Sequence, residues 1–185
     1  MDRLIGRYEG KEKGILFIAL GSIHGNEPAG TKALELMFKM LEVEPITNPN
    51  FSFKGRFIGL RGNLRAIQAG KRYLEKDLNR QWTVENVNRI MGSDRSILVA
   101  EDLEIREILE LIHQEIAEYQ PKKIVLLDLH TTTAFGGIFT IVTDDSDSLK
   151  VGIELHAPVI RGLLKGIKGT TLHYFNEENI GIPQN

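Results

Sequence analysis

The sequence contains no cysteine, and this absence removes three kinds of chemistry at once. Disulfide bonds, thiolate metal sites and cysteine nucleophiles are all excluded. Histidine, aspartate and glutamate remain as the residue types that bind metal ions. With 185 residues, 42% of them hydrophobic and 26% charged, the chain has a globular composition and is long enough to bury a core without covalent cross-links.

Long apolar runs are also missing. A membrane span needs about 18 consecutive apolar residues, and the best candidate, from Ile15 to Ile23, falls well short of that length. This run continues into His24 without the small-residue cleavage site that a signal peptide requires. We therefore expect a soluble, cytoplasmic protein with no membrane partner.

An excess of positive charge is missing as well. The 23 Lys and Arg residues are balanced by 25 Asp and Glu residues, which gives a net charge of −2 and a pI near 6.2. Proteins that bind nucleic acids through bulk charge are strongly basic, so we expect no nucleic-acid partner. The sequence carries no indication of an oligomeric state.

Apolar strand-like runs alternate with segments of helical periodicity along the chain. This alternation is typical of an α/β domain. Runs that are apolar on both faces indicate strands covered on both sides by helices. The strands that we expect are Ile15–Leu20, Phe53–Leu60, Ile124–Leu129, Ile138–Val142 and Pro158–Ile160, the helices are Asn26–Leu41 and Glu101–Tyr119, and a long polar loop spans Arg61–Arg80.

A candidate metal site follows two of the expected strands. His24 and Glu27 lie in the turn after the first strand, where Gly25 allows a tight fold, and His130 follows the strand that ends at Leu129. If both strands belong to one sheet, the three side chains meet at the carboxyl edge where α/β proteins bind ligands. Three protein ligands and a water form a catalytic zinc site. The alternative is two unrelated histidines that bond to backbone groups at strand ends.

The polar loop carries Arg72, Asp77, Asn79 and Arg80. Arginine binds carboxylates through two parallel hydrogen bonds, and an arginine beside a metal stabilises a developing oxyanion. The alternative is a solvated loop in which Asp77 and Arg80 form a surface ion pair that contributes little to stability.

These residues together resemble the succinylglutamate desuccinylase/aspartoacylase family, which belongs with the carboxypeptidase A-like zinc hydrolases. The matching motifs are His24-Gly25-Asn26-Glu27, then Arg72 with Asp77-Leu78-Asn79-Arg80, then Asp128-Leu129-His130 followed by threonines. They occur in the family's order between Gly21 and Thr133. Three separated motifs in order are far more specific than any one alone.

The resemblance implies a carboxypeptidase-like three-layer α/β/α sandwich with a central mixed sheet. It also implies one Zn²⁺ per chain, held by His24, Glu27 and His130. Arg72 would polarise the scissile carbonyl and bind the oxyanion as the catalytic arginine. The implied reaction is hydrolysis of a linear amide C–N bond in an N-acyl amino acid, which makes the protein a zinc-dependent amidohydrolase, or deacylase, with a small-molecule substrate.

Three further roles follow from the same resemblance. Asn79 and Arg80 would bind a carboxylate of the substrate, and Asp77 would orient His24 from behind the metal. The preference for zinc over iron, manganese or cobalt comes from its common use with two histidines and a glutamate.

The sequence departs from the family pattern in two places. Thr131 stands where relatives can carry Asn, which bears on substrate contacts. More seriously, the family's general-base glutamate follows a later strand in a Glu-x-Gly setting, and no such residue is present; Glu177 and Glu178 have the pattern of an exposed turn. We therefore expect residues 1–185 to form one zinc hydrolase catalytic domain that is incomplete at its C-terminus, as part of a longer or prematurely ended chain.

Two other functions are compatible with these residues. A carboxypeptidase-like metallopeptidase acting on short peptides would use the same ligands and arginines. A non-catalytic fragment could bind zinc and a carboxylate ligand without turnover, because removing a general base typically lowers the rate about 10²–10⁴-fold.

Overall fold

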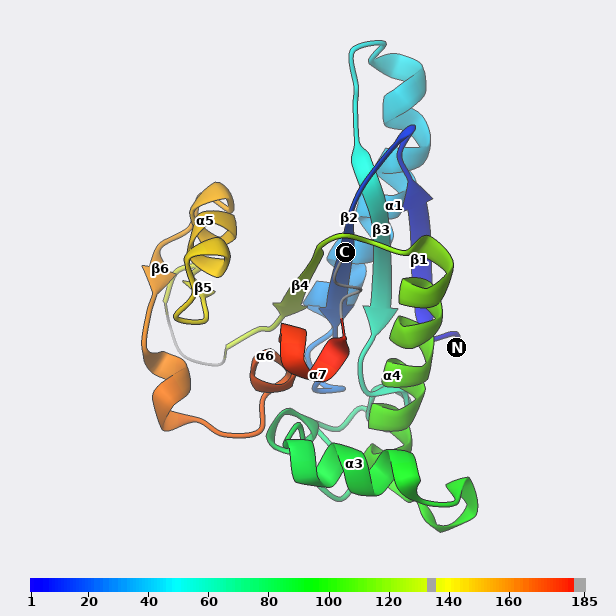
Figure 1. The fold of residues 1–185 in the computed structure, drawn as a ribbon, viewed down its shortest axis with the longest axis vertical. Coiled ribbons are helices and arrows are strands. Elements are labelled where there is room, and N and C mark those ends of the chain that lie inside the picture. The colour runs from blue at the N-terminus through cyan, green and yellow to red at the C-terminus, as the bar shows by residue number, and fades with distance from the viewer. Residues whose placement is uncertain (133–135, 182–185) are drawn as a thin grey trace.

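The computed structural model of the protein describes residues 1–132 and 136–181. Its main element is a four-stranded sheet with strand order β1-β3-β2-β4 (Figure 1). The strands are β1 (Leu4–Glu9), β2 (Glu12–Gly21), β3 (Lys54–Arg61) and β4 (Ile124–Leu129). Strand β2 is parallel to both β3 and β4, whereas β1 is antiparallel to β3, so the sheet is mixed, as expected.

Helices lie on both sides of this sheet. The longer ones are α1 (Ala29–Thr47), α3 (Val84–Gly92) and α4 (Ala100–Tyr119). Shorter ones are α2 (Leu64–Ala69), α6 (Thr171–Tyr174) and α7 (Glu177–Ile180), with the 3-10 turns η1 (Leu78–Arg80), η2 (Arg95–Ile97) and η3 (Leu163–Gly166). Within residues 1–132 and 136–181, every helix is too short or too polar to cross a bilayer.

The side chains of β2 alternate between two apolar layers, because successive residues of a strand point to opposite faces. The layer that joins β2 to α4 contains Leu16, Ile18, Leu20, Ile105 and Ile108. The layer that joins β2 to α1 contains Phe17, Ala19, Leu34 and Leu41. A helix on each face of the sheet gives the three-layer α/β/α arrangement, and the prediction of the fold class is confirmed.

A smaller unit lies beside β4 (Figure 1). It pairs β5 (Thr140–Ile141) with β6 (Val159–Ile160) in parallel and carries α5 (Ser146–Glu154). A cavity of about 900 Å³ separates this unit from β4 and is lined by apolar residues of both, among them Leu126 and Val151. Neither His24 nor His130 lines this cavity.

Helix α1 differs from the helix expected over residues 26–41. It begins three residues later, at Ala29, and continues beyond Leu41 through Pro45 to Thr47. The side chains that this part adds are mostly exposed, Val43 by 53% and Ile46 by 80%. Leu36, Met37 and Met40 belong to the apolar stripe that predicted this helix, and they are exposed too, so the stripe does not mark the buried face of α1.

The expectation of a continuous loop over residues 61–80 is wrong, because this stretch contains α2 and η1. Helix α2 buries only Ala66. Its ends are defined locally: the Asn63 side chain accepts a hydrogen bond from the Ala66 N–H (3.0 Å), and Gly70 adopts a left-handed conformation with φ 62°. Capping and not hydrophobic periodicity defines this helix.

The strand expected over residues 138–142 is shorter in the structure and belongs to another sheet. Only Thr140 and Ile141 form β5, and β5 pairs with β6 and not with the main sheet. Ile138 is 85% exposed and Phe139 44% exposed. The apolar run therefore does not mark a buried strand of the main sheet.

Two glycines allow α1 to begin directly against the strand ends. A Cβ atom on Gly21 would lie 2.6 Å from the backbone nitrogen of Thr31, and a Cβ atom on Gly30 would lie 2.8 Å from the Cβ atom of Leu129. Both distances are shorter than van der Waals contact, so the two residues set how closely α1 packs on the carboxyl ends of β2 and β4.

We expect Gly30→Ala to lower the free energy of unfolding by about 1–2 kcal/mol, since overpacking typically costs about 1–3 kcal/mol and alanine recovers up to about 1 kcal/mol of helix propensity. Gly92→Ala is the matched control: it also lies in a helix, but its new Cβ atom would meet no atom within 4 Å. The control should be neutral or stabilising. Urea denaturation measures both, and equal changes in the two variants would contradict the close-packing argument.

Candidate metal centre

The register between β2 and β4 brings the predicted metal ligands to one edge of the sheet. Gly21 lies opposite Leu129 in parallel strands, so the chain leaves both strands at the same level. His24 and Glu27 follow β2, and His130 follows β4 directly. The condition on which the predicted site depended, that both strands share one sheet, is therefore met.

The turn after β2 is held by local hydrogen bonds. Ser22 has a left-handed φ of 57°, and its hydroxyl donates to the carbonyl of Glu27 (2.9 Å). The Glu27 N–H donates to the carbonyl of His24 (3.0 Å). These bonds place the side chains of His24 and Glu27 on the same side of the turn.

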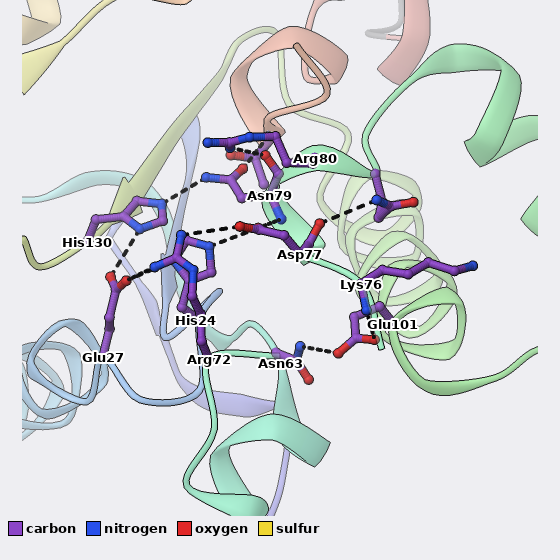
Figure 2. A network of polar contacts seen from close by, with 12 residues as sticks. His24, Glu27, Asn63, Arg72, Lys76, Asp77, Asn79, Arg80, Glu101 and His130 are labelled. Carbon is purple, nitrogen blue, oxygen red and sulfur yellow. Dashed lines mark hydrogen bonds and ion pairs between the residues drawn. The ribbon is translucent and has the colours of Figure 1, made fainter. Parts of the chain in front are cut away.

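The Glu27 carboxylate lies between the two imidazole rings (Figure 2). Its Oε1 atom is 2.9 Å from His24 Nδ1, and its Oε2 atom is 3.2 Å from His130 Nδ1. One ligating atom from each of the three residues lies within 4.8 Å of the other two. His24 and Glu27 are buried, and the His130 side chain is 32% exposed, so the cluster opens to solvent on the His130 side.

A second carboxylate holds the far nitrogen of each ring. His24 Nε2 is 3.0 Å from Asp77 Oδ1, and His130 Nε2 is 3.0 Å from Asp128 Oδ2. Carboxylates in this position fix the tautomer and orientation of metal-binding histidines. The family resemblance implied this role for Asp77, whereas the role of Asp128 was missed. The spacing of Asp128 and His130 could have indicated it, because residues two apart along an extended chain point to the same face.

The charges of the cluster favour an ionised carboxylate at its centre. Burial raises the pKa of Glu27, but hydrogen bonds from His130, His24 and the Thr131 N–H outweigh it and hold the pKa well below its usual range. For Asp77, burial is similarly outweighed by His24 and Arg72, so its pKa is also lowered.

His130 shows the opposite shift. Burial lowers its pKa, but the carboxylates of Asp128 and Glu27 outweigh this effect and raise the pKa to about 10. Without a metal, the ring therefore carries a proton at neutral pH and forms ion pairs with both carboxylates.

Arg72 lies at the exposed side of the cluster. Its Nη1 atom donates to Glu27 Oε1 (3.1 Å) and its Nη2 atom to Asp77 Oδ2 (3.2 Å). The side chain is 43% exposed. The loop is therefore not simply solvated. Asp77 pairs with Arg72 and His24, and not with Arg80 as the alternative of a surface ion pair required.

Asn79 and Arg80 occupy different environments. The buried Asn79 amide lies 3.1 Å from His130 Nε2, and its Oδ1 atom accepts the Thr171 N–H (3.0 Å). Arg80 is exposed, and its Nη1 atom donates to the carbonyl of Asn79 (2.7 Å). Thr171, whose hydroxyl also donates to Asp128 Oδ2 (2.7 Å), was missed, and nothing in its sequence neighbourhood signalled it.

Two other histidines and the two late glutamates lie outside this cluster. His113 is exposed on α4, and His173 bonds to Thr170 Oγ1 and the carbonyl of Leu164. Glu177 and Glu178 are exposed, as expected, but form the first turn of α7. Thr133, the last residue of the threonine motif, lies outside the described residues.

Comparison with known proteins identifies a family and several relatives. Residues 15–178 match the model of the succinylglutamate desuccinylase/aspartoacylase catalytic domain. A probable aspartoacylase from Nostoc sp. is 31% identical over 146 residues, which cover 79% of this chain and 45% of the relative. A succinylglutamate desuccinylase from Photorhabdus laumondii is 33% identical over 94 residues, covering 51% of this chain and 26% of the relative.

A solved structure gives the same fold. The succinylglutamate desuccinylase from Chromobacterium violaceum superposes with a TM-score of 0.53 at 19% identity, covering 79% of this chain and 48% of its own. The chain thus spans about half the length of the Nostoc and Chromobacterium proteins. The carboxypeptidase-like α/β/α fold is confirmed, and from the match over residues 15–178 the chain belongs to the succinylglutamate desuccinylase/aspartoacylase catalytic-domain family.

Proposed function

We propose that this chain carries the zinc site of a deacylase that hydrolyses the amide bond of N-acyl amino acids. The observation that carries the proposal is the cluster of His24, Glu27 and His130, in which each imidazole has one nitrogen toward Glu27 and the other against a carboxylate. Membership of the family supports the class of reaction. The substrate we propose is a small molecule of the cytoplasm and neither a nucleic acid nor a membrane lipid.

The chemistry of the donor set fits a zinc ion. Two imidazole nitrogens and one ionised carboxylate are the ligands of many catalytic zinc sites, which keep a further position open. When bound, zinc supplies Lewis acidity, which polarises a carbonyl group and lowers the pKa of water to about 7. Asp77 and Asp128 would keep the Nδ1 atoms of His24 and His130 directed at the ion.

Arg72 is positioned to assist the reaction from the exposed side. Its guanidinium contacts Glu27 and Asp77, so it is held at the edge of the cluster. A fixed cation at that place stabilises the negative charge that develops on the carbonyl oxygen during hydrolysis. We therefore propose that Arg72 stabilises the oxyanion that forms from the substrate carbonyl.

Arg80 is the residue that we propose to bind the substrate carboxylate. Its exposed guanidinium has a planar array of donors that matches a carboxylate. Asn79 links this region to His130 and Thr171, so we propose that it supports the site while it contributes to carboxylate binding.

Metal content tests the proposal most directly. Protein equilibrated with zinc and then dialysed should retain about one zinc per chain, as a three-ligand site requires, and His24→Ala and His130→Ala should lose it. His113→Ala is the control, because His113 is exposed on α4. Elemental analysis measures the content. Equal zinc in the wild type and both ligand variants would sink the assignment.

Zinc binding should release a proton at neutral pH. The pKa of His130 is raised to about 10 in the metal-free protein, and a histidine must be neutral to bind a metal. Below pH 10 the proton competes with zinc, so the apparent affinity should increase about tenfold per pH unit as the pH rises toward 10. Calorimetry in buffers of different ionisation enthalpy counts the protons. Binding at pH 7.5 without proton release would contradict the charge state of His130.

Hydrolysis of N-acetyl and N-succinyl amino acids, with dipeptides in parallel, tests the substrate class. We expect release of the free amino acid at a low rate, because residues 1–185 contain no glutamate in the family's general-base setting. Arg72→Ala should lower kcat by a further factor of about 10²–10³, which is typical when an oxyanion donor is removed. Arg161→Ala is the control, because Arg161 is exposed in the segment that follows β6. Cleavage of dipeptides alone would favour a metallopeptidase. Carboxylate binding without turnover would favour a non-catalytic module.

A further inference from the structure

Glu101 is a buried carboxylate that binds the backbone of a distant loop. Its Oε1 atom accepts the Leu74 N–H (2.7 Å), and its Oε2 atom accepts the N–H groups of Glu75 and Lys76 (3.1 Å each). The residue is 1% exposed. A carboxylate that accepts three consecutive amides fixes the path of that backbone in a way that a single hydrogen bond does not.

The loop that Glu101 holds connects two residues of the metal centre. Leu74, Glu75 and Lys76 lie between Arg72, which contacts Glu27, and Asp77, which contacts His24. This loop is largely exposed, so it has little apolar packing to fix it. Its start is tied to the metal-ligand turn, since the Gly25 N–H donates to the Arg72 carbonyl (3.0 Å). The hydrogen bonds to Glu101 hold the rest of the loop, residues 74–76.

Asn63 connects Glu101 to the end of the main sheet. Its Nδ2 atom donates to Glu101 Oε1 (3.1 Å), and its backbone N–H donates to the Ser22 carbonyl (2.9 Å) at the start of the His24 turn. Asn63 is fully buried. Figure 2 shows the Asn63 amide beside Glu101, and Glu101 next to Lys76 on the side of Asp77 away from His24. Through Asn63, the Glu101 carboxylate therefore fixes residues 74–76 relative to the end of β2, which also positions His24.

The backbone before Glu101 is strained. Ala100 has φ 40°, in the left-handed region that a residue with a Cβ atom seldom adopts. Such conformations persist where surrounding contacts determine them, and they cluster at functional sites. Burial raises the pKa of Glu101, but the N–H groups of Leu74, Glu75 and Lys76 and the amide of Asn63 lower it on balance, so the side chain is ionised at neutral pH.

We propose that Glu101 is a positioning residue of the metal centre, which it serves by holding residues 74–76 so that Asp77 orients His24 and Arg72 faces Glu27. The proposal rests on the proposed zinc site. Glu101 does not touch a proposed metal ligand, and it acts on the centre through the loop.

Glu104 provides a matched control on the same helix. It is also a buried carboxylate (0% exposed) that accepts backbone N–H groups, from Leu64 (3.1 Å) and Arg65 (3.1 Å). It holds the start of α2 and forms ion pairs with Arg3 and Arg65, but it has no bond to the 74–76 loop. Glu104→Gln therefore removes a comparable buried charge from α4 without removing a hydrogen bond to residues 74–76.

The experiment combines hydrogen exchange with zinc affinity on Glu101→Gln, Glu104→Gln and the wild type. In the wild type, the amides of residues 74–76 should exchange at least about tenfold more slowly than unstructured amides, since each is bonded to a buried carboxylate. Glu101→Gln should remove this protection and raise the zinc dissociation constant about tenfold, as loss of support behind a metal ligand does. Glu104→Gln should leave both unchanged, whatever its effect on unfolding.

Each other outcome overturns either this proposal or the proposed function on which it rests. Unprotected amides at residues 74–76 in the wild type would show that Glu101 does not hold the loop, and this measurement needs no variant to fold. Lost protection with an unchanged zinc dissociation constant would show that the loop does not support the metal centre, as would an equal weakening in Glu104→Gln. A wild type that keeps its protected loop but binds no zinc would instead refute the proposed function, so the two failures are distinguishable.

Discussion

The parallel pairing of β2 with β4 is the constraint on which the candidate site depends. The pairing of Gly21 with Leu129 places the chain ends of two strands, more than a hundred residues apart in sequence, at one level of the sheet. Gly30 then lets α1 begin against Leu129. A shift of register by one residue would turn every side chain of the strand to the other face and separate Glu27 from His130.

Charge alternates outward from the middle of the cluster. Glu27 lies between two imidazoles, each imidazole contacts a further carboxylate, and Arg72 bridges Glu27 to Asp77. Each buried charge has a partner of opposite sign, which offsets the cost of removing it from water. At the proposed metal site, a divalent ion would replace the positive charge of the proton on His130, so metal binding and protonation of His130 would compete.

The sequence was most informative where one local signal decided the structure. Apolar runs predicted β2, β3 and β4, and the residues that follow β2 and β4 gave the candidate metal ligands. It was less informative for two elements that carry no clear apolar pattern: β1 is an antiparallel edge strand with a half-exposed pattern, and α2 is defined by local capping at Asn63 and Gly70. Glu101, 25 to 27 residues from the amides it binds, had no sequence signal, because charged residues in the first turn of a helix are ordinary.

Strand β4 has a consequence for the protein in solution. Among the residues that the structure describes, it pairs with β2 alone, yet its sequence is apolar on both faces and every residue is partly exposed. A strand with one unpaired edge and an adjoining apolar cavity is a template for edge-to-edge aggregation. Self-association through this edge is therefore the expected behaviour of the chain at high concentration.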